Sequence, residues 1–187
     1  MAGCETIKTL FKGAGPGTHW HQNDARVQGL VGSARSSTVN AIVNHITAYS
    51  HPSPYLSVTS SFAIARRYAL LGPLGLAAPS APGCVYEIDL SAISNPVKLI
   101  DPIKHIASHF RGAGAHEHNG DQVLLSEIAM GNHGAKPYAK AHQLGGHLAM
   151  PAVNAQLTAL VFAIRDAELL VFGAVPHHAV VQRHDVW

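Results

Sequence analysis

The sequence is poor in charged residues, in cysteine and in long apolar runs. Charged residues make up only 13% of the 187 residues, about half the share that is usual in soluble domains. Lys and Arg number 13 against 11 Asp and Glu, and the longest basic run is Arg66-Arg67. The chain therefore lacks the basic stripe that would bind the phosphates of a nucleic acid.

The scarcity of cysteine and of apolar runs excludes further classes of protein. Cys4 and Cys84 are too few for a disulfide framework or a cysteine-based zinc site, and they allow one disulfide at most. The longest apolar stretches, such as Leu157 to Ile164, are far shorter than the ~20 residues that cross a bilayer. The amino terminus has no basic region followed by an apolar one. We therefore expect a soluble protein with no export signal and no membrane partner.

Histidine, by contrast, is abundant, since 14 His outnumber the 13 Lys and Arg together. Three close pairs could share a metal ion: His19 and His21, His116 and His118, and His177 and His178. None of them has the H-x-x-x-H spacing with an adjacent Glu that is typical of a zinc enzyme. We interpret them as scattered surface side chains and predict no metal site, although a His-ligated metal hydrolase is an alternative.

The apolar content favours one globular domain. Apolar residues make up 47% of the chain, which is the usual share, and a core of this size buries roughly 70% of the surface that the unfolded chain exposes. No internal repeat and no linker divides the sequence. We predict a single domain over residues 1–187.

Periodicity and turn residues predict the elements. Strands are expected at Thr6–Lys12, Tyr55–Thr59, Cys84–Leu90, Val97–Ile100, Leu157–Arg165, Glu168–Phe172 and Ala179–Gln182. Helices are expected at Ser37–Tyr49, Phe62–Leu71 and Gln122–Met130, a loop at Gly72–Gly83 and a turn at Gly173–His178.

Three segments place polar groups at strand positions that would otherwise be apolar. Lys12 leaves the first strand directly into a Gly-rich loop that starts at Gly13. Glycine lets a backbone approach a ligand closely, and a cation beside it can meet phosphate. Ser57 and Thr59 share one face of a strand that runs into a helix containing Tyr68, and such hydroxyls can position a polar group by hydrogen bonding.

The third segment places two carboxylates, Asp166 and Glu168, two residues apart. On one face of a strand they would repel each other, and a buried carboxylate is costly unless it is paired or hydrogen bonded. Such an arrangement indicates a functional role for the two carboxylates. In the alternative interpretation, the strand begins only at Leu169 and both acids lie in a solvated turn.

Taken in chain order, these segments resemble the ADP-ribosyltransferase superfamily of NAD-consuming toxins and effectors. In that family a basic residue, usually Arg, ends the first strand, and a Ser-Thr-Ser strand runs into a helix of the form A-x-x-Y-A. A Tyr-Glu-Ile-Asp strand follows, and a late strand carries a Glu before a G-x-I-P turn. The corresponding residues here are Lys12, Ser57-Val58-Thr59 with Ala65-Arg-Arg-Tyr68-Ala69, Tyr86-Glu-Ile-Asp89, and Asp166-Ala-Glu168 with Gly173-Ala-Val-Pro176.

The resemblance implies an α+β fold of two small, packed, mostly antiparallel sheets that form an NAD cleft, with flanking helices. Lys12 and Gly13 would lie near the pyrophosphate, and Tyr68 or Tyr55 would stack on the nicotinamide. Thr59 would help to shape the pocket. The long segment from His105 to Met150 would be an insertion, at about 105–150, that forms a lid or a target-facing pair of helices.

The resemblance also assigns the catalytic groups. Ser57 would hold Glu168 by a hydrogen bond, and Glu168 would accept a hydrogen bond from the 2'-hydroxyl of the nicotinamide ribose. Asp166 would orient or deprotonate the acceptor. A rival glutamate is Glu127, but Glu168 is preferred because the run through Gly173-Ala-Val-Pro176 fits it.

Two departures from the family pattern matter. Lys12 stands where Arg is usual, and Lys lacks the planar fork with which Arg binds phosphate in a bidentate way. His19 and His21 are alternatives for holding the nicotinamide ribose. Asp166 stands where enzymes that modify arginine have Glu or Gln, which weakens an inference that arginine is the acceptor.

The implied function is a mono-ADP-ribosyltransferase that cleaves NAD at the nicotinamide glycosidic bond and transfers ADP-ribose to a macromolecular acceptor. NAD would be a substrate, no metal would be needed, and a protein acceptor is preferred to a nucleic acid. The resemblance further implies a toxin or effector that is delivered into a target cell, with an immunity or antitoxin protein as partner. Alternatives are an NAD glycohydrolase and a non-catalytic binding module on the same fold.

Overall fold

The computed structural model describes residues 8–32, 38–48, 53–73, 75–94, 97–106 and 151–187. Two compact units can be distinguished by their internal contacts. The sheet unit comprises Met1–Ser33, Tyr55–Leu99 and Leu169–Trp187, and the helical unit comprises Ala34–Pro54 and Ile100–Glu168. The single domain over residues 1–187 stays a prediction.

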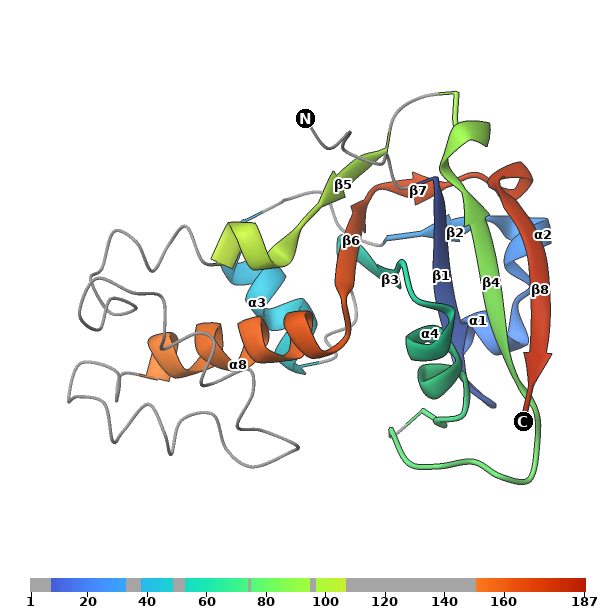
Figure 1. Cartoon of the computed structure of the whole chain (residues 1–187), viewed down its shortest axis with the longest axis horizontal. Helices are drawn as coiled ribbons and strands as arrows, with labels where there is room; N and C mark the ends of the chain where they lie inside the picture. The colour runs from blue at the N-terminus through green and yellow to red at the C-terminus, as the bar shows by residue number, and fades with distance from the viewer. Residues whose placement is uncertain (1–7, 33–37, 49–52, 74, 95–96, 107–150) are drawn as a thin grey trace, which may run out of the picture. The chain divides into compact units, whose positions relative to one another are not determined.

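The larger of two sheets has six strands in the order β5-β6-β3-β1-β4-β8 (Figure 1). In chain order the strands are β1 (Thr9–Ala14), β3 (Tyr55–Thr59), β4 (Gly83–Asp89), β5 (Lys98–Ile100), β6 (Glu168–Phe172) and β8 (Val180–Val186). β1 pairs antiparallel with β3 and β4, and β4 pairs antiparallel with β8. A second, two-stranded antiparallel sheet joins β2 (Leu30–Val31) to β7 (Ala174–Val175). The expected α+β architecture with two antiparallel sheets and flanking helices is thus confirmed.

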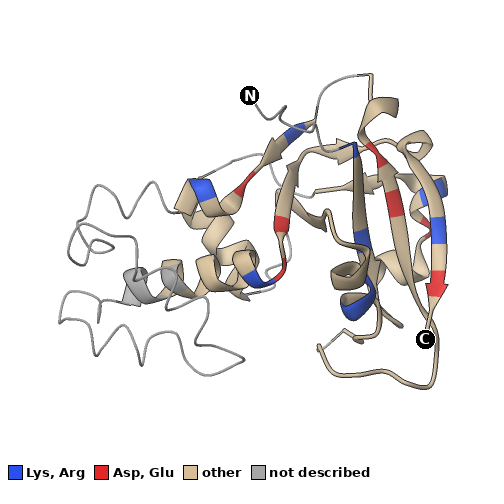
Figure 2. Cartoon of the chain, in the orientation of Figure 1, with Lys and Arg blue, Asp and Glu red and all other residues tan. Residues whose placement is uncertain are grey.

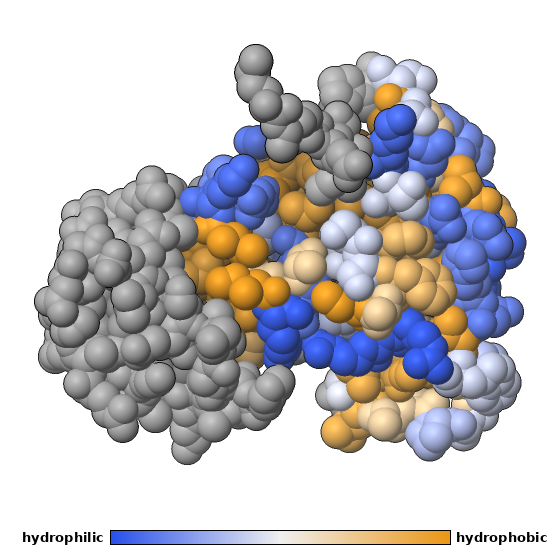
Figure 3. All heavy atoms as spheres, viewed as in Figure 1, coloured by the Kyte–Doolittle hydropathy of each residue, from blue (hydrophilic) through white to orange (hydrophobic). Residues whose placement is uncertain are grey.

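The described surface reflects the low charge of the sequence. Basic and acidic residues are spaced along the strands and helices of the sheet unit (Figure 2). Hydrophobic and hydrophilic residues are intermixed on the described part of the face shown in Figure 3. Among the described helices, none is long and apolar enough to cross a membrane.

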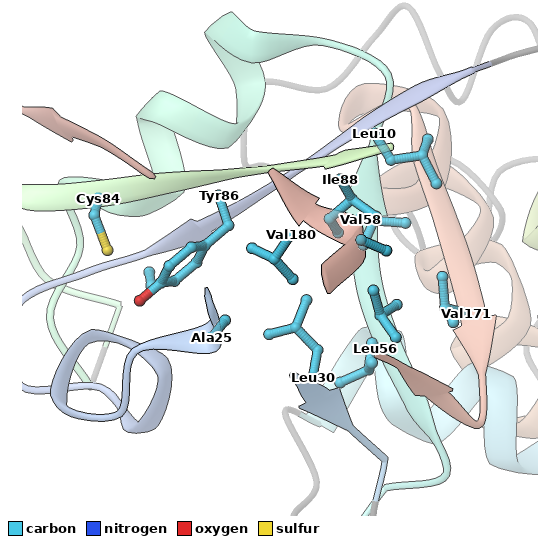
Figure 4. Packing of buried hydrophobic residues seen from close by; sticks show 13 residues of the cluster. Leu10, Ala25, Leu30, Leu56, Val58, Cys84, Tyr86, Ile88, Val171 and Val180 are labelled. Carbon is cyan, nitrogen blue, oxygen red and sulfur yellow. The ribbon is translucent and has the colours of Figure 1, made fainter. Parts of the chain in front are cut away.

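One face of the large sheet carries the main core of the sheet unit. Figure 4 shows Leu30, Leu56, Val58, Ile88 and Val180 pointing toward one another. Tyr86 and Cys84 extend this core along β4, and both side chains are fully buried. Each large apolar side chain buried in this way stabilises the fold by about 1.5–3 kcal/mol. Cys84 is a free thiol, and Cys4 lies outside the described residues.

Helix α4 (Phe62–Ala69) covers the opposite face of β1 and β4 (Figure 1). Ser61 caps it by accepting a hydrogen bond from the backbone N–H of Ile64. A Cβ built on Gly13 would lie 2.1 Å from the carbonyl oxygen of Ala65, and one built on Gly83 would lie 1.6 Å from that of Ala69. Because no side chain fits into these gaps, glycine at both positions lets the helix backbone rest directly on the sheet.

The helical unit contains α3 (Val39–Ala48) packed against α8 (Pro151–Arg165). Thr38 accepts a hydrogen bond from the backbone N–H of Ala41 at 3.1 Å and so caps α3, as Ser, Thr, Asp and Asn commonly do. Buried side chains of α3 are Ile42, Val43 and Ile46, and those of α8 include Ala159, Leu160 and Ala163.

Most of the predicted elements are present, with shifted ends. Those confirmed are Thr6–Lys12 (as β1), Ser37–Tyr49 (α3), Tyr55–Thr59 (β3), Phe62–Leu71 (α4), Cys84–Leu90 (β4), Val97–Ile100 (β5), Glu168–Phe172 (β6) and Ala179–Gln182 (β8). The loop at Gly72–Gly83 is confirmed as well. The predicted helix Gln122–Met130 and nearly all of the expected insertion at 105–150 lie outside the described residues.

Two predictions of secondary structure were wrong. The strand expected at Leu157–Arg165 is the second half of α8. Its apolar run is rich in Ala and Leu, which favour helix, and short apolar runs do not distinguish helix from strand by periodicity. The turn expected at Gly173–His178 contains β7, which pairs with β2. Short elements also went unpredicted: α1 (His19–Gln22), α2 (Ala25–Gln28) and β2.

The contact between α4 and the sheet gives a first test. Gly83→Ala is expected to lower the free energy of unfolding by about 1–3 kcal/mol, because the added methyl group would overlap the backbone of Ala69. Gly72→Ala is the matched control, since its Cβ would meet its nearest neighbour at 3.6 Å. The control should change stability by less than about 0.5 kcal/mol. Equal urea midpoints for the two variants would contradict this account of the packing.

Candidate functional site

The strands that carry the motif segments are neighbours in the large sheet. β6, which begins with Glu168, is next to β3 with its Ser-x-Thr pattern. β3 is next to β1, which contains Lys12, and β1 is next to β4, which contains Tyr86-Glu-Ile-Asp89. Four segments that are far apart in the sequence therefore occupy the consecutive order β6-β3-β1-β4.

Pairing along β1 is uneven. Toward β4, every residue from Thr9 to Ala14 is aligned with a partner. Toward β3, within the part of the chain that the structure describes, Phe11 is aligned with Thr59. Next to this pair, the Lys12 ammonium donates a hydrogen bond to the backbone oxygen of Ser57 at 3.2 Å. The Lys12 cation is thus hydrogen-bonded to a β3 carbonyl close to the aligned pair of Phe11 and Thr59.

The register separates Lys12 from the hydroxyl pair. Successive side chains of a strand point to opposite faces. Phe11 contacts Phe62 of α4, with ring centroids 5.5 Å apart, so Phe11 and its partner Thr59 lie on the α4 face. Ser57 shares that face with Thr59, whereas Lys12 extends from the other face, and its terminal ammonium reaches the backbone of β3.

Thr59 has a structural partner close by. Its buried hydroxyl accepts a hydrogen bond from the backbone N–H of Ser61 at 3.1 Å. This bond fixes the turn from β3 into α4, which is a common use of Ser and Thr. Ser57 is half-buried on the same face.

Tyr68 and Gly13 are in contact. A Cβ on Gly13 would lie 3.0 Å from the Cβ of Tyr68, so α4 fills the space above this glycine. We expected a ligand to approach the backbone at Gly13. On the α4 face of the sheet, the helix itself occupies that position. The Arg67 guanidinium lies 5.0 Å from the centroid of the half-buried Tyr68 ring and donates to its hydroxyl at 3.4 Å.

Tyr55, the other aromatic candidate, is only 2% exposed. Its ring packs against that of Phe172, with 5.9 Å between the centroids. Of the two tyrosines expected to stack on nicotinamide, Tyr68 is the one with an exposed part in this structure.

The candidate histidines lie in the short helix α1, which follows β1 and its glycine loop. His19 is exposed, and its ring contacts that of Trp20 edge to face. His21 shares a hydrogen bond with the backbone oxygen of Pro82 at 3.0 Å. The hydroxyl of Tyr86 donates to the backbone oxygen of Trp20 at 2.8 Å, so α1 is attached to β4 and to the loop before it.

The two carboxylates belong to the helical unit and do not share a strand face. β6 begins at Glu168, and Asp166 lies in the turn after α8. Between them Ala167 has a φ of 43°, in the left-handed region that turns the chain. The expected arrangement on one face is therefore wrong, and so is the alternative of two solvated acids, because Asp166 is only 6% exposed.

Asp166 is held by Arg165. The guanidinium donates two hydrogen bonds, at 2.8 and 2.7 Å, one to each carboxylate oxygen. It also lies 4.6 Å from the centroid of the Phe162 ring. Such a bidentate pair fixes the orientation of the carboxylate.

A further polar cluster was not predicted from the sequence. Asp24 pairs with Arg26 at 2.6 Å and with Arg183 at 3.8 Å, and Arg183 pairs with Asp185 at 3.1 Å. The hydrogen bond from Arg26 holds the pKa of Asp24 below its usual range. Burial raises the pKa of the neighbouring Tyr86 to about 12, so its hydroxyl stays protonated and keeps donating to Trp20. Only the strand pattern of Tyr86-Glu-Ile-Asp89 signalled this region.

The remaining candidates from the sequence are the paired histidines and Glu127. Among the described residues, no three His, Cys, Asp or Glu side chains are grouped closely enough to hold a metal ion. His116, His118 and Glu127 lie outside the described residues.

Comparison with known proteins finds no matching family model, no matching curated protein and no matching solved structure.

The polar cluster gives a prediction about pH. Because the pKa of Asp24 is lowered in the folded state, its ionised form stabilises the fold above the ordinary pKa of 3.8, and that contribution is lost as pH falls below it. Asp24 also caps α2 by accepting a hydrogen bond from the backbone N–H of Arg26 at 2.9 Å. Asp24→Asn keeps a capping side chain and removes the charge. It should lower the free energy of unfolding at pH 7 by up to about 1 kcal/mol. Urea unfolding at pH 7 and near pH 3 checks this, and a difference of the same size at both pH values would contradict it.

Proposed function

We propose that this chain is a mono-ADP-ribosyltransferase that cleaves NAD at the nicotinamide glycosidic bond and transfers ADP-ribose to a macromolecular acceptor. The observation that carries the proposal is the adjacency of the four motif strands in the order β6-β3-β1-β4. Residues that resemble one enzyme family along the sequence are thereby gathered in neighbouring strands of a single sheet.

The carboxylate at the start of β6 supplies the main catalytic effect. When neutral nicotinamide leaves, the ribose carbon C1' gains positive charge, and a fixed carboxylate stabilises this transition state more than the ground state. Glu168, with its hydrogen bond to the 2'-hydroxyl, fills this role. Nicotinamide departs with the electron pair of the broken glycosidic bond. A nucleophile of the acceptor forms a bond to C1' and releases its proton to solvent.

Lys12 contributes charge for the pyrophosphate. The ammonium is held at the backbone of β3 by its bond to Ser57, which places a cation near where the recorded β1–β3 pairing stops. A lysine acts toward phosphate as a point charge, without the bidentate geometry of arginine. Tyr68, whose ring is already contacted by Arg67, supplies the aromatic surface for nicotinamide. Tyr68 belongs to α4, and Lys12 extends from the opposite face of the sheet, so in this proposal NAD passes the end of the β1–β3 pairing to meet both side chains.

Asp166 receives a positioning role in this proposal. A carboxylate whose two oxygens both accept hydrogen bonds from one guanidinium is held in a fixed orientation. The Arg165–Asp166 pair fixes the turn at Ala167, from which Glu168 enters β6.

The experiment is the release of nicotinamide from NAD by the purified full chain, with and without cell lysate as a source of acceptor. Glu168→Gln preserves shape but removes the charge, and it should slow release by about 10²–10³-fold. Glu127→Gln is the matched control and should leave the rate unchanged. No release by the wild-type chain under either condition would reject the proposal, and loss of release with Glu127→Gln alone would reject the assignment to Glu168.

Lys12 allows a test of the pyrophosphate role. Lys12→Met removes the cation and should raise KM for NAD about tenfold, which corresponds to about 1.4 kcal/mol of binding. Lys12→Arg keeps the charge and should leave KM within about threefold of the wild type. Thermal melting of both variants controls for folding. An unchanged KM in a folded Lys12→Met variant would mean that Lys12 does not contact the pyrophosphate.

A further inference from the structure

β8 (Val180–Val186) lies at an end of the six-stranded sheet (Figure 1). Among the described strands it has one neighbour, β4. The backbone groups on the other side of such an edge strand form a template to which another strand can add. What pairs there depends on the side chains along the strand.

The edge combines charges of both signs with exposed apolar side chains. Arg183 and Asp185 form an ion pair along the strand, and the Asp185 side chain is 64% exposed. Figure 2 shows this as a basic band followed by an acidic one near the end of β8. Val181 is 52% exposed and Trp187 is 70% exposed. Arg66 of α4 donates a hydrogen bond to the backbone oxygen of Trp187, so this end of the strand is held in place.

We propose that β8 pairs antiparallel with β8 of a second copy of this chain, about a two-fold axis at His184. The sequence Val-Gln-Arg-His-Asp-Val-Trp from Val181 to Trp187 is complementary to itself in this arrangement. Arg183 of each copy comes opposite Asp185 of the other, which makes two symmetry-related ion pairs. Val181 of each copy comes opposite Trp187 of the other, so two exposed apolar side chains cover each other.

The charges select this register over its neighbours. A shift of two residues keeps the same sheet faces together, but in one direction it places Arg183 opposite Arg183. In the other direction it places Asp185 opposite Asp185. Like charges directly opposite each other are destabilising in an antiparallel pair. Parallel in-register pairing would also bring the two arginines together.

Two features that commonly protect sheet edges limit the strength of this contact. The pairing of β4 with β8 has a register shift between Glu87 and Ile88, and Val181 is the extra residue of this bulge. Bulges and charged side chains discourage indiscriminate edge pairing. A single seven-residue strand is also a small interface beside the about 1,200–2,000 Å² that stable complexes bury. The dimer is therefore weak and dependent on concentration.

The test is sedimentation of the full chain over a concentration series that reaches about 1 mM. The wild-type chain should pass from monomer to dimer within this range. Val181→Lys places a cation in the pairing edge and should weaken dimerisation at least tenfold. Leu76→Lys is the matched control, since Leu76 is an exposed apolar residue in the loop before β4, away from the pairing edge, and it should leave the dimer unchanged.

A second variant protects the test against misfolding. Asp185→Arg changes an exposed side chain and would bring arginines face to face across the axis, so it too should abolish the dimer. Circular dichroism confirms that each variant is folded. A wild-type chain that stays monomeric to about 1 mM overturns the proposal. So does a dimer that both folded edge variants retain, because it would then form through another surface.

Discussion

The sheet unit depends on the packing of α4 against two glycines. At Gly13 of β1 and Gly83 of β4 the helix backbone occupies the space where any other residue would place a side chain. The helix begins directly after β3, through the turn that Thr59 and Ser61 fix. The packing of α4 therefore also determines where β3 lies with respect to β1 and β4. The position of β3 in turn determines where the candidate side chains lie.

β1 is joined to β3 by a side-chain hydrogen bond, whereas it is joined to β4 by a full ladder of aligned residues. The full alignment of β1 with β4 makes a rigid ladder, while the hydrogen bond from Lys12 to Ser57 bonds a β3 carbonyl by a side chain. A half-buried ammonium is thereby stabilised beside the strand that carries the hydroxyl pair. The same bond that supports the sheet supplies the cation that the proposed chemistry requires.

The sequence predicted the six strands of the large sheet well, because their alternation and their Gly and Pro boundaries are local signals. Tyr55–Thr59 has the predicted ends. The strand predicted at Leu157–Arg165 was wrong because a short apolar run fits a buried helix as well as a strand. For the site, composition could not reveal that α4 covers Gly13 or that a turn at Ala167 separates Asp166 from β6. Both depend on contacts and dihedral angles that no pattern of residue types encodes.

The most direct test of an NAD site on these strands is the change in backbone amide NMR signals of isotope-labelled protein when NAD is added. The proposed function predicts saturable changes that are largest around Lys12, Ser57 and Tyr68, on β1, β3 and α4. Changes confined to other parts of the chain, such as β8, or none at millimolar NAD, would contradict an NAD site at the centre of this sheet.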